Sequence, residues 1–164
     1  MRLFIAALVN DPVKAALLDL QRQMREQRVG GSYTAPENLH LTLTFIGEYP
    51  DPDRVLETMG QIPFRPFRLE LSGVGCFGDL WWVGIRGPAA PEGYVRRLRR
   101  GLAAADIPFD RKGFFPHFTL VRRADRAPAG LTVPAAGMEV TRVSLMRSDR
   151  GKNGMIYTEV GGIE

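Results

Sequence analysis

The sequence predicts an α+β fold of two similar lobes, which together form a single domain over residues 1–164. The length suits one domain, since domains commonly run about 100 to 200 residues. Each half of the chain has a helical pattern, then a loop with proline and glycine, and then a strand with a histidine. This repeated order favours a duplicated architecture.

The first half begins with a predicted strand at residues 2–9 and continues into an amphipathic helix. Asp11 is the expected N-cap of that helix and Pro12 its first residue, because both residue types favour helix starts. Turn-forming residues then lead into "LHLTLTFIG" at residues 39–47, a predicted strand. A short second helix is expected over residues 50–62. The apolar positions of the first helix recur at helical spacing: Val13, Leu17, Leu20 and Met24.

The second half begins with two strand-like runs at residues 64–78 and 80–87, whose Gly-Asp junction predicts a hairpin. A helix with one apolar face and one arginine-rich face is expected over residues 91–106. The strand that contains the second histidine follows. The pattern then predicts a loop and two closing strands, at 124–137, 138–150 and 154–162.

The composition is that of an ordinary globular protein, with 45% hydrophobic and 24% charged residues. No apolar run approaches the roughly 18 residues of a membrane span, and the single cysteine, Cys76, excludes an internal disulfide or a zinc-thiolate cluster. We therefore expect a cytoplasmic protein without a membrane partner. The net charge is +4, and nearly all of the basic residues are arginines. This composition permits but does not require a phosphate-bearing partner such as RNA.

Each of the chain's two histidines lies in a predicted strand with a threonine two residues further on. Because successive strand side chains alternate between faces, His40 projects with Thr42, and His117 projects with Thr119. Apolar residues on the opposite face anchor each strand. If the two strands lie side by side, two imidazoles and two hydroxyl groups face one cavity.

A lone His-x-Thr strand is more often a partly buried structural feature than a reaction site. Here both histidines are followed by threonine and leucine at the same positions, which favours a shared chemical role. A neutral imidazole accepts a proton and a charged one donates a proton near neutral pH, and phosphoester hydrolysis needs both transfers. The sequence has no His-Glu-x-x-His pattern and no P-loop, so we expect neither a metal nor a cofactor.

The paired "HLTL" and "HFTL" segments, about half a chain apart, resemble those of the two-histidine (2H) phosphoesterases. The segments "MRLFIAAL", "PENLHLTLTFIGE", "LWWVGI" and "MIYTEV" resemble the branch of RNA 2′,3′-cyclic phosphodiesterases, also known as 2′-5′ RNA ligases. The resemblance implies a bilobal fold with two mostly antiparallel sheets flanking a central cleft and helices packed outside. It also implies opening of terminal 2′,3′-cyclic phosphates to 2′-phosphates without metal or ATP, and the reverse joining through a 2′-5′ linkage.

Carried over to this chain, the resemblance implies that His40 is the general acid toward the 3′ oxygen and His117 the general base for water. The two roles are expected to exchange in the ligation direction. Thr42 and Thr119 would hold phosphate oxygens, with Arg122 as a further phosphate ligand. Strict alternation from His117 directs Arg122 to the wrong face, so that role requires a bulge or a strand that ends near Val121.

Two further expectations concern the surroundings of the predicted site. Many relatives have a lysine where this chain has Thr44, so a basic contact there is lost or is supplied elsewhere. Phe4, Tyr33 and Phe115 are candidates for stacking on a base. The expected partner is RNA with 2′,3′-cyclic phosphate ends, with tRNA halves as one candidate, and the expected state is a monomer.

Two alternative functions remain open. The first is another 2H activity on small cyclic nucleotides or nucleotide-sugar cyclic phosphates. The second is a noncatalytic RNA-binding protein, although phosphate binding alone would not require two histidines in place of further arginines.

Overall fold

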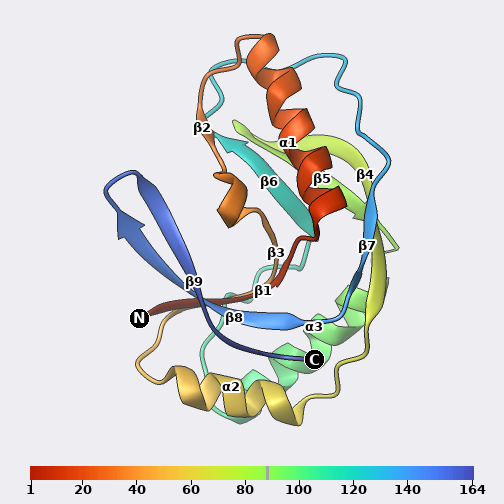
Figure 1. Cartoon of the computed structure of the whole chain (residues 1–164). Coiled ribbons are helices and arrows are strands. Elements are labelled where there is room, and N and C mark those ends of the chain that lie inside the picture. Colours follow the sequence, from red (N-terminus) through yellow and green to blue (C-terminus); the bar gives the residue numbers. More distant parts are fainter. Residues whose placement is uncertain (88) are drawn as a thin grey trace.

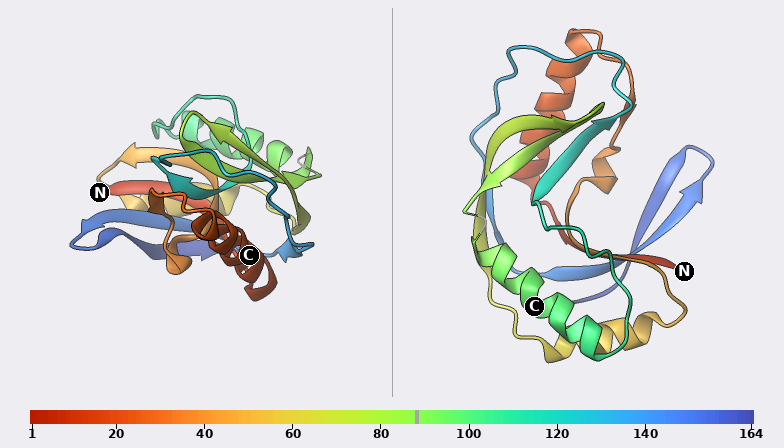
Figure 2. Two further views of the ribbon diagram at one scale, coloured as in Figure 1. Left: turned by 90° about the horizontal axis from the view of Figure 1, so that it is seen from above. Right: turned by 180° about the vertical axis from the view of Figure 1, so that it is seen from behind.

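One strongly curled, antiparallel sheet forms the framework of the protein in the computed structural model, which describes residues 1–87 and 89–164. Nine strands take part in it, and three α-helices lie outside its curve (Figures 1 and 2). The prediction of an α+β fold is confirmed. The prediction of two separate sheets is wrong, because strands β3 and β6 pair directly at Leu41 and Phe118 and all the strands belong to one sheet.

The order of the strands in the sheet is β7-β4-β5-β6-β3-β1-β8-β9, and the short β2 pairs with β6. The two histidine-bearing strands are thus neighbours at the middle of the sheet. The strands are β1 (Arg2–Leu8), β2 (Ser32–Tyr33), β3 (His40–Glu48), β4 (Phe67–Phe77), β5 (Leu80–Arg86), β6 (His117–Arg122), β7 (Gly137–Val140), β8 (Val143–Gly151) and β9 (Gly154–Ile163).

The helices are α1 (Asp11–Glu26), α2 (Pro52–Gln61) and α3 (Ala89–Ala104), with a short 3₁₀ turn, η1 (Pro36–Asn38), before β3. The expected N-cap of α1 is off by one residue. Asn10 is the cap, and its side chain accepts a hydrogen bond from the backbone N–H of Val13 at 3.0 Å. Asp11 instead occupies the first turn, where a carboxylate also interacts favourably with the helix dipole.

The predicted strand over residues 138–150 is interrupted, because Thr141 and Arg142 separate β7 from β8. β7 pairs with β4, whereas β8 pairs with β1 and β9. The chain therefore crosses from one end of the curled sheet to the other at this break. The apolar positions change phase across the break, from Met138 and Val140 to Val143 and Leu145, but this shift does not specify the new partner strand.

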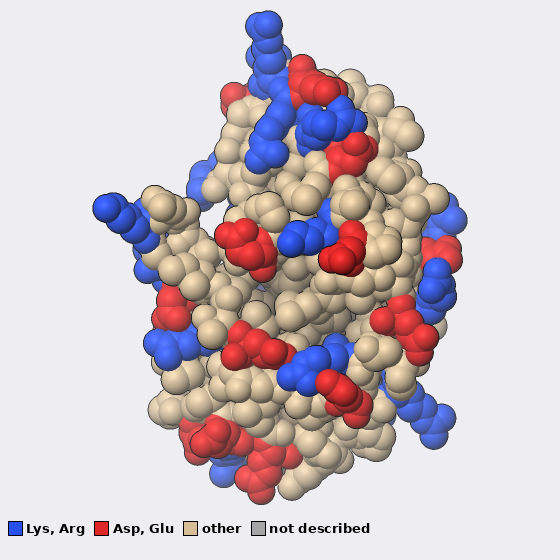
Figure 3. Space-filling model, in the orientation of Figure 1, with Lys and Arg blue, Asp and Glu red and all other residues tan. Residues whose placement is uncertain are grey.

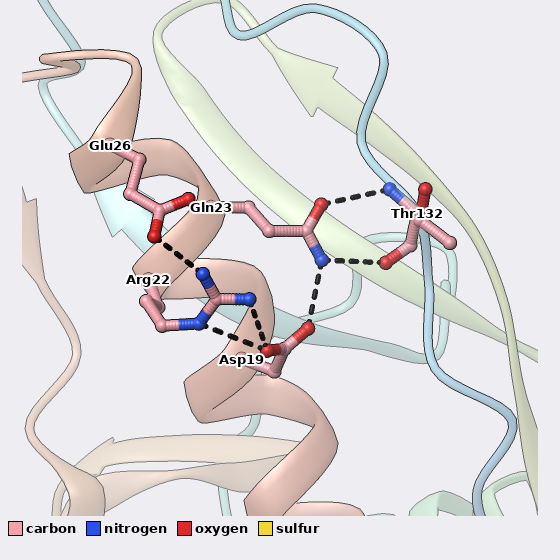
Figure 4. A network of polar contacts seen from close by, with 5 residues as sticks. All are labelled: Asp19, Arg22, Gln23, Glu26 and Thr132. Atoms are coloured by element: carbon pink, nitrogen blue, oxygen red, sulfur yellow. Dashed lines mark hydrogen bonds and ion pairs between the residues drawn. The ribbon is translucent and has the colours of Figure 1, made fainter.

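Two glutamines of α1 hold the long segment between β6 and β7. The Gln23 side chain donates to the carbonyl of Thr132 at 2.8 Å and accepts from its N–H at 2.9 Å (Figure 4). Gln27 makes the same pair of bonds with Ala129, at 2.6 and 2.8 Å. Each amide side chain thus satisfies both backbone groups of a residue that has no strand partner.

The hydrophobic core has a large and a small part. The large cluster joins the outer face of the sheet to all three helices and includes Leu41 and Phe118, the residues behind the two histidines. The small cluster lies on the other face and comprises Phe4, Ala6 and Met146, with Phe45 and Tyr157 packed against it. Strands β3 and β6 are therefore anchored from behind, which leaves their histidines toward the concave side.

Candidate active site

The concave side of the sheet contains a cavity of about 870 Å³ whose wall includes both histidines. Thr42, Thr119 and Arg122 also line it, so all five site residues predicted from the sequence meet in one place. The direct pairing of β3 with β6 brings them together, since His40 is adjacent to Leu41 and His117 is adjacent to Phe118. Residues from β1, β8 and β9 complete the wall.

Both imidazoles are fixed through the same main-chain contact. Nδ1 of His40 lies 2.6 Å from the carbonyl oxygen of Asn38, and Nδ1 of His117 lies 2.6 Å from that of Phe115. A carbonyl oxygen only accepts, so Nδ1 must hold the proton in each ring. In the neutral rings Nε2 consequently carries no proton and can accept one.

Burial lowers the pKa of both histidines below the usual value for imidazole. The carbonyls bonded to Nδ1 act in the opposite direction, and the nearby charge of Arg122 lowers both pKa values further. His117 also lowers the pKa of His40. Arg122 lines the same cavity as the two rings.

The two threonines differ in their contacts. The Oγ1 of Thr42 lies 2.8 Å from Nε2 of His40, so when the ring is neutral the hydroxyl donates a hydrogen bond to Nε2. Thr119 lines the same cavity from β6. Both side chains are half-buried, which leaves part of each available to a molecule in the cavity.

Arg122 reaches the cavity because β6 contains a β-bulge. Thr119 pairs with Trp82 of β5, and Val121 pairs with the adjacent Trp81, so Leu120 is an extra residue in β6. Leu120 and Val121 are consecutive and both fully buried, which breaks the alternation of faces. After the bulge, Arg122 returns to the face of His117 and lines the cavity.

Several basic residues of the cavity wall were not predicted from the sequence. Arg2 enters from β1, and Arg147 and Arg150 enter from β8, together with the carboxylates of Glu48 and Asp149. Asp149 pairs with Arg147 at 2.9 Å. The β8–β9 hairpin projects from the body, and Figure 3 shows basic side chains at its tip. These arginines are remote from both histidines in the sequence, so spacing offered no signal for them.

Thr44 does not line the cavity. It is 1% exposed, and its hydroxyl donates to the carbonyl of Leu43 at 2.8 Å. A second break in alternation causes this: Ile5 pairs with Thr44 but Ala6 pairs with Thr42, so β3 has an extra residue at Leu43. Basic groups of the cavity therefore come from elsewhere, as the arginines of β1 and β8 show.

The three candidate stacking residues have different surroundings. Phe4 is 3% exposed and packs against His40, with ring centroids 5.0 Å apart. Tyr33 lies under the guanidinium of Arg25, and its hydroxyl donates to a backbone carbonyl. Phe115 is 46% exposed and lies 5.7 Å from the His117 ring.

Within residues 1–87 and 89–164, no cluster of three or more histidine, cysteine, aspartate or glutamate residues has the arrangement of a metal site. None of the described helices is long and apolar enough to cross a membrane. The exposed Cys76 lies on β4 and does not line the cavity.

Comparison with known proteins identifies this chain as a phosphoesterase homologue. The model of LigT-like phosphoesterases matches residues 8–80, which include His40 and Thr42. Curated relatives extend the likeness across the second histidine. The RNA 2′,3′-cyclic phosphodiesterase of Thermus thermophilus is 36% identical and covers 96% of this chain and 87% of its own length. That of Aeropyrum pernix is 34% identical, over 74% of this chain and 78% of its own.

Solved structures agree with this assignment. Apo LigT of Escherichia coli superposes with a TM-score of 0.84 at 26% identity, over 99% of this chain and 95% of that one. A structure from Thermus thermophilus gives a TM-score of 0.80 at 32% identity, over 99% and 96% of the two chains. Escherichia coli LigT has also been solved with 3′-AMP and with phosphate. The chain belongs to the LigT-like 2H phosphoesterases, among the homologues of RNA 2′,3′-cyclic phosphodiesterases.

Proposed function

We propose that this protein hydrolyses the 2′,3′-cyclic phosphate at the end of an RNA chain to a 2′-phosphate. The observation that carries the proposal is the meeting of two Nδ1-anchored imidazoles with two threonines and an arginine in one cavity. In both rings Nδ1 is bonded to the main chain, which leaves Nε2 available for proton transfer. The relatives of this chain that bear the name RNA 2′,3′-cyclic phosphodiesterase support the choice of substrate.

In the proposed reaction His117 is the general base and His40 the general acid. Nε2 of His117 removes a proton from water as the water oxygen bonds to phosphorus. The bond between phosphorus and the 3′ oxygen breaks, and His40 in its charged form donates the Nε2 proton to that oxygen. The product is a 2′-phosphomonoester with a free 3′-hydroxyl, and the protons balance when the two rings exchange one through solvent.

Phosphate binding prepares the acid. Burial lowers the pKa of His40, which favours its neutral form, and the negative charge of a bound phosphate acts in the opposite direction. Neutral His40 accepts a hydrogen bond from the Thr42 hydroxyl. Protonated His40 can no longer accept this bond, so the Thr42 hydroxyl becomes free to donate a hydrogen bond to a non-bridging oxygen, beside Thr119 and Arg122.

The same groups join two RNA ends when a 5′-hydroxyl takes the place of water. His117 then removes the proton of the 5′-hydroxyl, and His40 again protonates the departing 3′ oxygen, which leaves a 2′-5′ linkage. The roles therefore do not exchange in the ligation direction, contrary to the expectation from the sequence. They exchange in the cleavage of that linkage, in which His40 is the base and His117 the acid. Ligation is an expected minor activity that grows with the concentration of 5′-hydroxyl ends, because water is the more abundant nucleophile.

A small cyclic nucleotide is the second candidate substrate. Escherichia coli LigT has been solved with 3′-AMP, a mononucleotide, which favours a cavity of this family that accepts a single nucleotide.

We also propose that the two lobes are pseudo-symmetric parts of one domain over residues 1–164. The bonding of both histidines to the carbonyl two residues earlier supports this proposal.

The test uses metal-free protein in EDTA with an RNA that ends in a 2′,3′-cyclic phosphate, and separately with nucleoside 2′,3′-cyclic phosphates. We expect a 2′-phosphate product from the RNA and loss of turnover in His40→Ala and His117→Ala. Arg122→Ala should raise KM, whereas Arg123→Ala, one residue beyond the cavity, is the matched control. Unchanged turnover in either histidine variant would contradict the mechanism.

The substrate comparison separates the alternatives. Turnover of nucleoside cyclic phosphates without turnover of RNA ends would identify the small-molecule activity. RNA binding without turnover of either substrate would identify a noncatalytic protein.

A further inference from the structure

A cluster of aromatic rings lies beside His117 on the side away from His40. Phe77 ends β4 and Phe115 precedes β6, and they are 51% and 46% exposed. The centroid of each ring lies 5.7 Å from that of His117. Trp82 of β5 joins them, 5.4 Å from Phe77 and 4.9 Å from Phe115. Single exposed aromatic residues are common, but three in contact beside a reacting imidazole require an explanation.

A separate cavity of about 390 Å³ adjoins this cluster. Trp82 and Phe115 line it, as do Gly73 and Gly84. Trp82 pairs with Thr119 and Gly84 with His117, so both β5 residues occupy the face of the sheet that holds the candidate active site. Trp82 and Gly84 therefore place part of the wall of the smaller cavity on that face, beside His117.

The missing side chain of Gly75 creates space for the indole. A Cβ atom at Gly75 would lie 2.3 Å from a ring carbon of Trp82. Gly75 of β4 thus provides the seat for Trp82. In that seat the indole Nε1–H is buried and has no hydrogen-bond partner among the described residues. A buried donor without a partner is rare in a folded protein.

The aromatic residues on the His40 side are less exposed. Phe4 is 3% exposed, and the rings of Phe4, His40 and Tyr157 contact one another, with centroids 5.0 to 5.3 Å apart. The guanidinium of Arg2 covers Phe45, with its carbon 4.8 Å from the ring centroid. Phe45 and Tyr157 on that side are half-buried, so the most exposed rings near the two histidines, Phe77 and Phe115, are on the side of His117.

We propose that the surface formed by Phe77, Trp82 and Phe115 binds the nucleobase of the nucleotide that bears the cyclic phosphate. The inference rests on the proposed function, because it takes the phosphate to lie between the histidines. A base and a phosphate on the same ribose are one sugar ring apart, which is comparable to the 5.7 Å between His117 and the two phenylalanine rings. Stacking on aromatic faces accepts every base, with purines favoured by their larger area.

The test compares adenosine 2′,3′-cyclic phosphate with 1-O-methylribose 2,3-cyclic phosphate, which lacks the base. In the unmodified protein we expect the base-free compound to have a KM about 5- to 150-fold higher, the range given by stacking of one base. Phe77→Leu and Phe115→Leu should raise KM for the adenosine compound and leave KM for the base-free compound unchanged. Phe109→Leu, a half-buried phenylalanine outside the cluster, is the matched control.

Two results would overturn the proposal. One is equal KM for both compounds in the unmodified protein. The other is an equal loss of kcat/KM for both in Phe115→Leu, since the ring would then only support His117. If neither compound is turned over, the proposed function fails instead. Binding of adenosine 2′-monophosphate and 1-O-methylribose 2-phosphate, measured by calorimetry, then decides the base site, with the same preference expected.

Discussion

Gln21 of α1 is the residue whose replacement best connects the fold to the site. It is 1% exposed, and its Nε2 donates to the carbonyls of Thr34 and Leu120, each at 2.9 Å. Leu120 is the extra residue of the bulge that returns Arg122 to the cavity. We predict that Gln21→Met, which keeps the size of the side chain, both destabilises the protein and weakens substrate binding.

The magnitude follows from the two hydrogen bonds. A neutral hydrogen bond contributes about 0.5–1.5 kcal/mol, so the loss of both lowers the free energy of unfolding by about 1–3 kcal/mol. Leu120 keeps the bond from the Thr34 N–H at 3.0 Å, which limits the cost. For a domain of this size each kcal/mol lowers Tm by about 2–4 °C. Thermal unfolding followed by circular dichroism measures it, with Gln61→Met at the exposed end of α2 as the control.

The functional part is measured by a double-mutant cycle. If Gln21 acts on the site through the bulge, Gln21→Met raises KM in the natural background but has little further effect in Arg122→Ala. The reasoning is refuted if Gln21→Met unfolds at the same temperature as the unmodified protein. It is also refuted if its effect on KM simply adds to that of Arg122→Ala.

The remaining predictions concern the two imidazoles and the threonines. The pH profile of kcat/KM should be bell-shaped with an optimum below neutrality, because burial lowers the pKa of both His40 and His117, and a flat profile between about pH 5 and 8 would contradict the mechanism. The unfolded chain binds a proton at His40 below about pH 6.5 that the folded chain does not, so stability falls as the pH drops through that window. Urea unfolding at pH 7 and at pH 5 should show a smaller fall in the free energy of unfolding for His40→Asn than for the unmodified protein. An equal fall would contradict the contribution of His40. Thr42→Val should lower kcat by roughly 10²-fold, whereas Thr44→Val, buried away from the cavity, should leave kcat nearly unchanged.

Local patterns in the sequence were sufficient for the centre of the site. Alternation within a strand determines which side chains share a face over two or three residues, and this correctly placed His40 with Thr42 and His117 with Thr119 in the wall of one cavity. Arg122 lies five residues beyond His117, and a bulge intervenes. No residue type at Leu120 distinguishes a bulge from a regular strand, so the sequence only showed that one was needed.

Long-range pairing was the part that the sequence did not reveal. A single residue pair, Leu41 with Phe118, joins the β7-β4-β5-β6 part of the sheet to the β3-β1-β8-β9 part, and neither residue has a local property that specifies its partner. The same reason conceals Arg147 and Arg150. They enter the cavity because β8 lies beside β1, which in turn lies beside β3. Their distance from His40 along the chain has no relation to this order.

The acceptors that orient the two imidazoles belong to the main chain. Nδ1 of each ring bonds to the carbonyl two residues earlier, at Asn38 and at Phe115. A side-chain carboxylate in that position can be deleted by one codon change, but a peptide carbonyl is present whatever residue occupies the position. Mutation at Asn38 or Phe115 can shift the acceptor but cannot remove it. The tautomer of both histidines is thus protected against substitution, and sequence drift around the site is tolerated as long as the backbone keeps its path.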